Sequence, residues 1–231
     1  MREIVLDTET TGLDPKSGHR IVEIGCVELI NHVPTGAVYH QYVNPERDMP
    51  AEAERVHGLS ETFLKDHPVF AKVSDTFVEF IGDATLVIHN AAFDMGFINA
   101  ELDRLDIEAI PMHRAVDTVT MARKKFPGAQ ASLDALCRRF GIDLSGREFH
   151  GALLDAQLLA DVYLELLGGR QHGMDLAAET EMANTHVGTE PSGGAATMGR
   201  RAPRPHTISG DEEARHATFL EKLKDPIWLR T

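Results

Sequence analysis

The sequence is poor in cysteine, in aromatic residues and in long apolar runs, and each shortage excludes a class of protein. The two cysteines, Cys26 and Cys137, are too few for a disulfide framework and lack the spacing of a zinc site. We expect both to be small core residues in a reducing cytoplasm. No apolar run approaches the roughly 20 residues that a membrane-spanning helix requires, and the N-terminal MREIVLDTET carries no signal-peptide pattern. The composition predicts a globular protein without a membrane segment.

Basic residues are scarce as well. The 231 residues include 23 Lys and Arg against 36 Asp and Glu, a net charge of −13. Residues 1–169 hold 15 basic and 27 acidic residues, a net charge of −12, and residues 170–231 hold 8 and 9, a net charge of −1. Nucleic acids prefer basic surfaces. A polyanion would therefore have to be held through metal ions or by a partner protein.

The hydrophobic pattern predicts an α/β domain over residues 1–169. Strands are expected at 2–7, 20–30, 33–44, 84–90 and 115–117. Helices are expected at 60–67, 74–82, 92–105, 118–125, 132–140 and 151–167. The first three strands have short connections, which favours an antiparallel meander. The later strands alternate with helices, so we expect a mixed sheet flanked by helices.

Carboxylates are placed at the ends of these elements. Asp7 and Glu9 lie two positions apart at the end of the first strand, and so on one face of it. Asp94 follows the strand ATLVIHN, and Asp155 lies one turn into the helix that begins near Gly151. Neighbouring negative charges repel, and burial disfavours the ionised form. The four acids therefore need a positively charged partner.

His150 extends this set. It lies five positions before Asp155, which on one helix would separate the two side chains by roughly 140°, so we place His150 on the loop before the helix. Four carboxylates and one histidine, without thiolates, suit Mg²⁺ or Mn²⁺. Two such ions, about 3.5–4 Å apart, would clamp the attacking and leaving oxygens of a phosphodiester. The sequence thus predicts two-metal hydrolysis.

Other polar residues have simpler explanations. Asp14 precedes Pro15 and is expected in a turn. Asp117 is placed to cap the helix that follows it. By themselves, Glu52 would be a surface charge and His57 a loop histidine.

Three motifs occur in a fixed order: DTETTG from Asp7, HNAAFD ending at Asp94, and HGALLD from His150 to Asp155. Together they resemble the DEDDh 3′–5′ exonucleases, over about residues 2–167. The resemblance implies a ribonuclease H-like fold. It also implies roles for the site residues: direct metal ligands Asp7, Glu9 and Asp155, a water-mediated ligand Asp94, and the general base His150.

A further resemblance concerns one branch of that family. VHGLS, from Val56 to Ser60, and the position of Glu52 are similar to the proofreading subunits of bacterial DNA polymerase III. This implies that Glu52 and His57 lie against the terminal nucleotide of a single-stranded or frayed DNA 3′ end, which Asp7, Glu9 and Asp155 also contact. The implied partners are the polymerase (alpha) subunit and a sliding clamp, and a further small core subunit is left open.

The tail after residue 169 differs in composition. Residues 170–208 should form a flexible linker, because EPSGGAATMGRRAPRP is rich in glycine, proline and alanine and the linker has no aromatic residue. Residues 171–176 resemble the clamp-binding box of bacterial replication proteins, with its anchors at Gln171, Met174 and Leu176. Leu176 stands where the best-known box has phenylalanine.

The C-terminal segment, residues 209–231, is expected to dock on the polymerase subunit. Ser209 and Glu212 form a capping box that starts a helix. The apolar residues that would bind the partner are Leu220, Leu223 and Trp228, and tryptophan is enriched among binding hot spots. The segment therefore predicts a tether.

Two alternative functions compete with a proofreading exonuclease that releases nucleoside monophosphates. One is an RNA-trimming enzyme similar to ribonuclease T or oligoribonuclease, although trimming alone does not require the two-part tail. The other is a non-enzymatic adaptor between polymerase and clamp, which would not require the intact acid set. The sequence favours the proofreading exonuclease.

Overall fold

The computed structural model describes residues 1–146, 149–169 and 209–220. The chain divides into two units, Met1–Asp175 and Leu176–Thr231. The predicted linker at 170–208, with Gln171, Met174 and Leu176, lies outside the described residues, as do Leu223 and Trp228. Within the described parts, none of the helices is long and apolar enough to cross a membrane.

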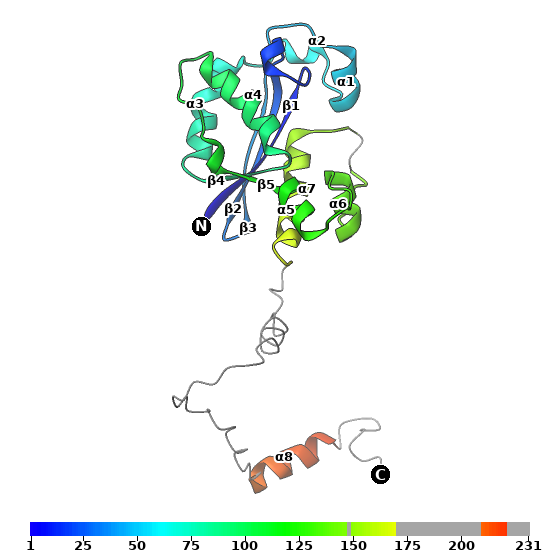
Figure 1. Cartoon of the computed structure of the whole chain (residues 1–231). Coiled ribbons are helices and arrows are strands. Elements are labelled where there is room, and N and C mark those ends of the chain that lie inside the picture. The colour runs from blue at the N-terminus through cyan, green and yellow to red at the C-terminus, as the bar shows by residue number, and fades with distance from the viewer. Residues whose placement is uncertain (147–148, 170–208, 221–231) are drawn as a thin grey trace, which may run out of the picture. The chain divides into compact units, whose positions relative to one another are not determined.

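A five-stranded mixed sheet is the centre of the first unit (Figure 1). Its strands are β1 (Arg2–Thr10), β2 (Ile21–Ile30), β3 (Val33–Tyr42), β4 (Thr85–Ile88) and β5 (Ala115–Asp117), in the order β3-β2-β1-β4-β5. β1, β2 and β3 pair antiparallel, while β4 is parallel to β1 and β5 is parallel to β4. The predicted meander and mixed sheet are confirmed. The carboxyl ends of β1, β4 and β5 consequently meet at one edge of the sheet.

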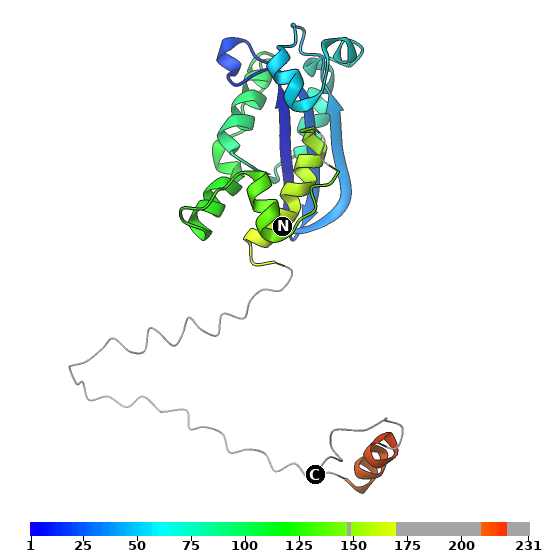
Figure 2. The same cartoon turned by 90° about the vertical axis from the view of Figure 1, so that its right-hand side faces the viewer.

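Helices cover both faces of the sheet. Their bounds are η1 Pro15–Ser17, α1 Ala51–His57, α2 Glu61–Leu64, α3 Phe70–Ile81, α4 Ala91–Asp103, η2 Met112–Arg114, α5 Thr118–Lys125, α6 Leu133–Phe140 and α7 Ala152–Leu166. In Figure 1, α3 and α4 lie on one side of the sheet and α5, α6 and α7 on the other. The view in Figure 2 shows α7 running along the long strands, which it contacts at β1 and β2.

The alternation of side chains along β1 divides the core into two clusters. Ile4 and Leu6 face α3 and α4, where they pack with Phe77 and Phe97. Val5 faces the other way and packs with residues of α5, α6 and α7. Each fully buried side chain of this size contributes about 1.5–3 kcal/mol to stability. The sheet is therefore buried on both faces and forms a fixed platform for the acids of β1.

Gly25 allows α7 to lie directly on the sheet. A Cβ at this position would overlap the backbone of Ala152 and Leu153 at the start of α7. Gly25 is also the partner of Asp7 in the β1–β2 ladder. Glycine inside a strand commonly marks such a close backbone approach. This contact sets the start of α7 beside the acidic end of β1.

Four expected element bounds were wrong. β1 continues to Thr10 instead of ending at residue 7, because Thr8 and Glu9 still pair with β2. α1 was not predicted; its N-cap is Pro50, which makes no side-chain cap, so the start signal is missing. The helix expected at 60–67 is only the four-residue α2, since Pro68 disfavours a helical residue before it. α3 begins at Phe70 instead of residue 74.

The predicted caps at Asp117 and at Ser209–Glu212 are confirmed, and Asp14, which was expected in a turn, is a cap as well. Asp14 is the N-cap of η1 and accepts from the Lys16 N–H at 2.9 Å. Asp117 caps α5 and accepts from the Val119 N–H at 2.9 Å. In the second unit, α8 (Gly210–Leu220) follows the capping box that its sequence predicts. The Ser209 N–H donates to Glu212 Oε2 at 3.0 Å, and the Glu212 N–H donates to Ser209 Oγ at 3.4 Å.

Candidate active site

Three of the predicted site residues meet at the carboxyl end of β1. Glu9, His150 and Asp155 each offer a ligand atom, and these atoms lie within 4.8 Å of one another. His150 Nδ1 is 3.3 Å from Asp155 Oδ2. Asp155 is buried, whereas half of the His150 side chain is exposed. The three residues come from a strand, a loop and a helix, so only the fold brings them together.

Asp94 is fixed to the same strand by a different route. It lies in the first turn of α4 and is almost fully buried. Its Oδ1 accepts hydrogen bonds from the Thr8 N–H at 3.0 Å and from Thr8 Oγ1 at 2.7 Å. Burial raises the pKa of Asp94 to about 7, and the bonds from Thr8 act in the opposite direction. These two bonds fix Asp94 to β1 at Thr8, the residue between Asp7 and Glu9 in the sequence.

Asp7 lies opposite Gly25 in the β1–β2 ladder, and Gly25 contacts the start of α7. It is half-buried, points to the face of β1 that α7 covers, and pairs with Gly25. Asp7 and Glu9 therefore share one face of β1, as their spacing predicts. The structure places Asp7 near the start of α7, although the 4.8 Å group of ligand atoms contains only Glu9, His150 and Asp155.

His150 lies on the loop before α7, as expected. The N-cap of α7 is Gly151, in extended conformation, so His150 precedes the helix. The His150 N–H donates to the Val56 carbonyl at 3.2 Å. Because Val56 belongs to α1, this hydrogen bond joins the histidine loop to the helix that carries Glu52 and His57.

Glu9, His150 and Asp155 are called the acid cluster below. A pocket of about 600 Å³ opens next to this cluster, between the end of β1 and α1. Its walls include Glu9, Thr10, Glu52, Val56, His57 and Phe93. The two residues expected to contact a terminal nucleotide, Glu52 and His57, thus line one cavity together with the proposed metal ligand Glu9. Exposed apolar surface at Val56 and the ring of Phe93 would suit a sugar or a base.

His57 lies on a helix that the sequence pattern did not predict. It is the last residue of α1 and is buried. The Leu59 N–H donates to His57 Nδ1 at 3.0 Å, which places the ring proton on Nε2. Burial lowers the pKa of His57, and a hydrogen bond with the Thr10 backbone acts in the opposite direction. His57 is therefore a neutral hydrogen-bond donor.

The donor set fits a hard divalent cation. It consists of carboxylate oxygens and one imidazole, without sulfur. Asp94 and Asp155 are both nearly inaccessible to water, and buried carboxylates of one cluster are stabilised by an added positive charge. The residues present therefore match the ion type that the sequence predicts.

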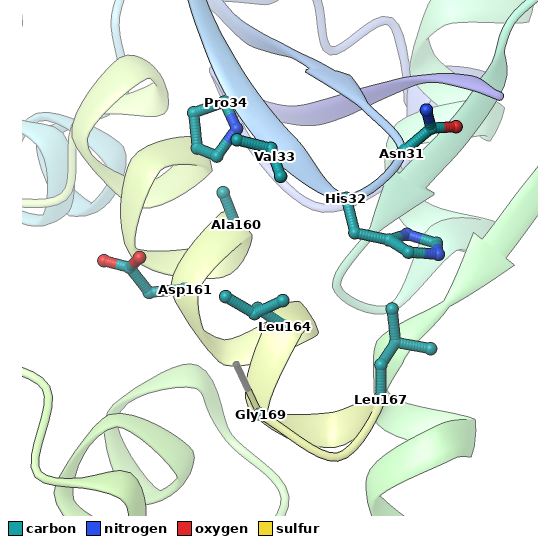
Figure 3. Close-up of a pocket in the computed structure, with 9 residues that line it drawn as sticks. All are labelled: Asn31, His32, Val33, Pro34, Ala160, Asp161, Leu164, Leu167 and Gly169. Atoms are coloured by element: carbon teal, nitrogen blue, oxygen red, sulfur yellow. The ribbon is translucent and has the colours of Figure 1, made fainter. Parts of the chain in front are cut away.

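A different cavity, of about 410 Å³, lies at the other end of α7 (Figure 3). Val33 and Pro34 of β3 line it together with Leu164 in the last turns of α7. Beside it, the buried Glu3 accepts from the Tyr163 hydroxyl at 2.7 Å and lies 2.7 Å from His32 Nδ1. None of the proposed catalytic residues lines this cavity. The contacts of Glu3 with Tyr163 and His32 join α7 to the sheet.

Sequence reasoning missed several residues that build the site. Thr8 fixes Asp94, Gly25 admits α7, and the Val56 carbonyl holds the loop of His150. A signal existed for Gly25, because a glycine within the buried run IVEIGCV marks a close backbone approach. No local signal identifies Val56, since its contribution is a backbone carbonyl on an unpredicted helix.

Comparison with known proteins agrees with this geometry. The family model described as "Exonuclease" matches residues 4–163. The chain is 56% identical over 187 residues to the DNA polymerase III subunit epsilon of Rickettsia conorii, covering 80% of this chain and 81% of that protein. It is 49% identical over 187 residues to the same subunit of Escherichia coli strain K12, covering 78% and 76%.

Solved structures show a similar fold. Exonuclease X in complex with 5′ overhanging duplex DNA matches with a TM-score of 0.56 and 24% identity, over 71% of this chain and 90% of that one. The nuclease domain of 3′hExo, a DEDDh family member bound to rAMP, matches with a TM-score of 0.63 and 20% identity, over 72% and 91%. The expected ribonuclease H-like fold is confirmed.

Proposed function

This chain belongs to the exonuclease family and is a metal-dependent 3′–5′ proofreading exonuclease of the DNA polymerase III epsilon type. We propose that it hydrolyses the last phosphodiester of a DNA 3′ end, and that the reaction takes place at Glu9, His150 and Asp155. One observation carries the proposal: two motifs far apart in the sequence place the ligand atoms of Glu9, His150 and Asp155 within 4.8 Å of one another. A mispaired end frays at lower cost than a paired one, so it would reach the site more often.

The proposed ligands of two divalent ions, Mg²⁺ or Mn²⁺, are Asp7, Glu9 and Asp155, with Asp94 acting through water. Bound there, such ions supply Lewis-acid stabilisation of the phosphoryl oxygens and activation of the attacking water. The chain's own contribution is to hold the carboxylates in place. Asp94 is fixed by two hydrogen bonds from Thr8, and the start of α7 is fixed on Gly25.

His150 is the proposed general base. With its Nδ1–H directed at Asp155 Oδ2, 3.3 Å away, the ring accepts a proton from the attacking water at Nε2. Its half-exposed position on a loop lets the ring reach the water and then return the proton to solvent or to the leaving oxygen. Asp155 orients the ring and stabilises the imidazolium that forms.

The terminal nucleotide is proposed to occupy the pocket of about 600 Å³ beside α1. His57 and Glu52, which both line this pocket, would lie against the nucleotide, and Glu52 would accept from a sugar hydroxyl. Neither contact requires a particular base, which suits an enzyme that must remove any mispaired nucleotide.

A single assay separates this function from its alternatives. DNA with a mismatched 3′ end and a matched RNA, both labelled at the 5′ end, are incubated with the full chain and either Mn²⁺ or EDTA. We expect the DNA to be shortened from its 3′ end with Mn²⁺ and to remain intact with EDTA. Faster shortening of the RNA would favour a trimming enzyme, and no shortening of either would favour the adaptor.

The tail is proposed to tether this activity to the replication machinery in the bacterial cytoplasm. In this arrangement residues 1–169 form the exonuclease domain and residues 170–208 the linker. The clamp would be bound through Gln171, Met174 and Leu176, and the alpha subunit through residues 209–231. A tether keeps the nuclease at a high local concentration near the primer end.

Deleting residues 209–231 is expected to abolish co-elution with the polymerase alpha subunit while cleavage of free oligonucleotides continues. The helix that the Ser209–Glu212 capping box starts is short enough to be marginal alone, and Trp228 would be its anchor in a partner. Size-exclusion chromatography of the mixed subunits is the measurement. The inactive full-length Asp155→Ala variant, which should still co-elute, is the control. Co-elution of the deleted chain would place the docking surface on residues 1–208.

A further inference from the structure

A second polar pocket lies at the same edge of the sheet as the acid cluster. It has a volume of about 520 Å³ and is lined by the ends of β4 and β5, by α5 and by the loop before α6. The lining residues that matter here are His89, Asn90, Asp117, Arg123, Gln130 and Ser132. β1 lies between β2 and β4 in the sheet. Along this edge, the nucleotide pocket is therefore at β1 and the second pocket is at β4 and β5.

The second pocket adjoins the acid cluster. α5 and α6 both contact α7, the helix of Asp155. Burial lowers the pKa of His89, while the negative charges of Asp117 and Asp155 act in the opposite direction. Asp155 is thus within electrostatic reach of His89, which lines the second pocket. The acid cluster has the nucleotide pocket on one side, through Glu9, and the second pocket on the other.

Arg123 gives the second pocket its only positive side chain. Among the residues that line either pocket in the described part of the chain, it is the only lysine or arginine. The nucleotide pocket instead contains the acids Glu9, Asp14 and Glu52. In a domain whose net charge is −12, Arg123 marks the position in these two linings where a phosphate would meet a cationic side chain.

Two basic residues near Arg123 serve the fold, whereas Arg123 does not. Lys125 donates to the Glu165 and Leu166 carbonyls at the end of α7, and Arg139 lies over the Phe126 ring. The Arg123 side chain is exposed and makes no hydrogen bond or ion pair with any residue of the described ranges. Its charge is therefore available to a ligand in the second pocket.

Asp117 does not oppose an anion as strongly as its charge implies. Its Oδ1 accepts from the Asn90 N–H at 3.1 Å and from the Val119 N–H at 2.9 Å. Its Oδ2 accepts from the Thr120 hydroxyl at 3.1 Å. The carboxylate is therefore turned toward the start of α5. Neutral donors remain around the pocket, because Ser132 Oγ accepts from the Ala135 N–H and keeps its own proton to donate.

We propose that the second pocket binds the sugar–phosphate backbone of the retained DNA strand, on the 5′ side of the bond that is cut, with Arg123 paired to a phosphate. This rests on the proposed function. The terminal nucleotide fills the pocket at α1 and the scissile phosphate lies at the cluster, so the rest of the strand leaves across β4 and β5. Asn90, Gln130 and Ser132 supply neutral hydrogen bonds to phosphate or sugar, without reading the bases.

The test compares two substrates that differ only in the retained strand. One is a single-stranded DNA oligonucleotide. The other is the 4-nitrophenyl ester of thymidine 5′-monophosphate, which has one nucleotide and, on the 5′ side of the cleaved bond, only the nitrophenol leaving group. In the full chain, Arg123→Gln should raise KM for the oligonucleotide by about five- to tenfold, as loss of one solvent-exposed hydrogen bond would. Its kcat on the oligonucleotide and its hydrolysis of the ester should be unchanged.

The salt dependence provides a second readout. Each phosphate contact on a single strand contributes about 0.7 to the slope of log affinity against log salt, and Arg123→Gln should lower the slope by about that amount. Arg123→Lys should restore most of the affinity. Lys124→Gln removes the same charge from the next position of α5, outside the pocket lining, and should leave KM unchanged.

Three results would overturn the proposal. They are an unchanged oligonucleotide KM in Arg123→Gln, an equal rise in Lys124→Gln, and a parallel loss of ester hydrolysis, which would mean that Arg123 supports the catalytic cluster or the fold. If the unaltered chain cleaves both substrates normally and any of these results is found, the proposed backbone site is rejected and the proposed function stands. Failure of the unaltered chain to cleave either substrate would instead remove the proposed function together with this site.

Discussion

Asp155→Ala is expected to lower the rate of DNA cleavage by about 10³-fold or more. Lewis-acid stabilisation by a bound metal is worth several kcal/mol, and each 1.36 kcal/mol is about a factor of ten in rate. Asp155 is buried within the 4.8 Å cluster, where no neighbouring side chain could replace it as a ligand without moving the backbone of α7. Asp7→Ala and Glu9→Ala are expected to give losses of the same order.

The loss should come from the metal site and not from unfolding. Removing a buried carboxylate from a cluster of acids relieves repulsion, so the metal-free variant should melt no lower than the unaltered chain. An ion that binds only the folded protein raises its melting temperature, and Mn²⁺ should therefore stabilise the unaltered chain but not Asp155→Ala. Thermal unfolding with and without Mn²⁺ measures both points.

Asp161→Ala is the matched control for this experiment. Asp161 is an exposed acid on the same helix, at the far cavity of Figure 3. It should keep both cleavage and stabilisation by Mn²⁺. If Asp155→Ala retained either of these properties, the assignment of Asp155 as a metal ligand would be wrong.

His150→Ala is expected to lower kcat by about 10²–10⁴-fold, the usual contribution of a general base, while stabilisation by Mn²⁺ persists. The physical reason is the position of the ring, half exposed on a loop and 3.3 Å from Asp155. Such a ring is better placed to move a proton than to anchor an ion. Single-turnover cleavage and thermal unfolding with Mn²⁺ are the two measurements.

The competing role for His150 is that of a ligand, since one of its ring nitrogens lies in the 4.8 Å group. The two roles differ in what is lost. A general base affects the rate alone, whereas a ligand affects the rate and the metal-dependent melting temperature together. His113→Ala, which changes an exposed histidine on η2, should affect neither.

Sequence reasoning succeeded where local signals are strong. β5 and α5 have the predicted bounds, because Asp117 ends one element and caps the next within two residues. The helix of Asp155 and the loop of His150 were also placed correctly, since the spacing of the two residues excludes a shared helical face. In these cases the deciding interactions lie within a few residues of one another.

It failed where partners far along the chain decide the structure. β1 extends through Glu9 only because β2 pairs with it, and the sequence of β1 alone shows an apolar run that ends earlier. α1 lacks a side-chain cap, so the burial of His57 and the hydrogen bond from the His150 N–H to the Val56 carbonyl could not be foreseen. The residues of the candidate site could be predicted from the motifs, but their separations could not.

The contact at Gly25 has a consequence for the accuracy of the proposed metal site. Side chains between a helix and a sheet adopt alternative rotamers and tolerate substitution, so a spacing set by them varies between related cores. At Gly25 the backbone of α7 meets the backbone of β2 with no side chain in between, and backbone atoms have fixed dimensions. The spacing between the acids of β1 and the start of the helix that carries Asp155 is therefore set by backbone contact. We expect substitutions deeper in the core under α7 to change stability while this spacing stays nearly constant.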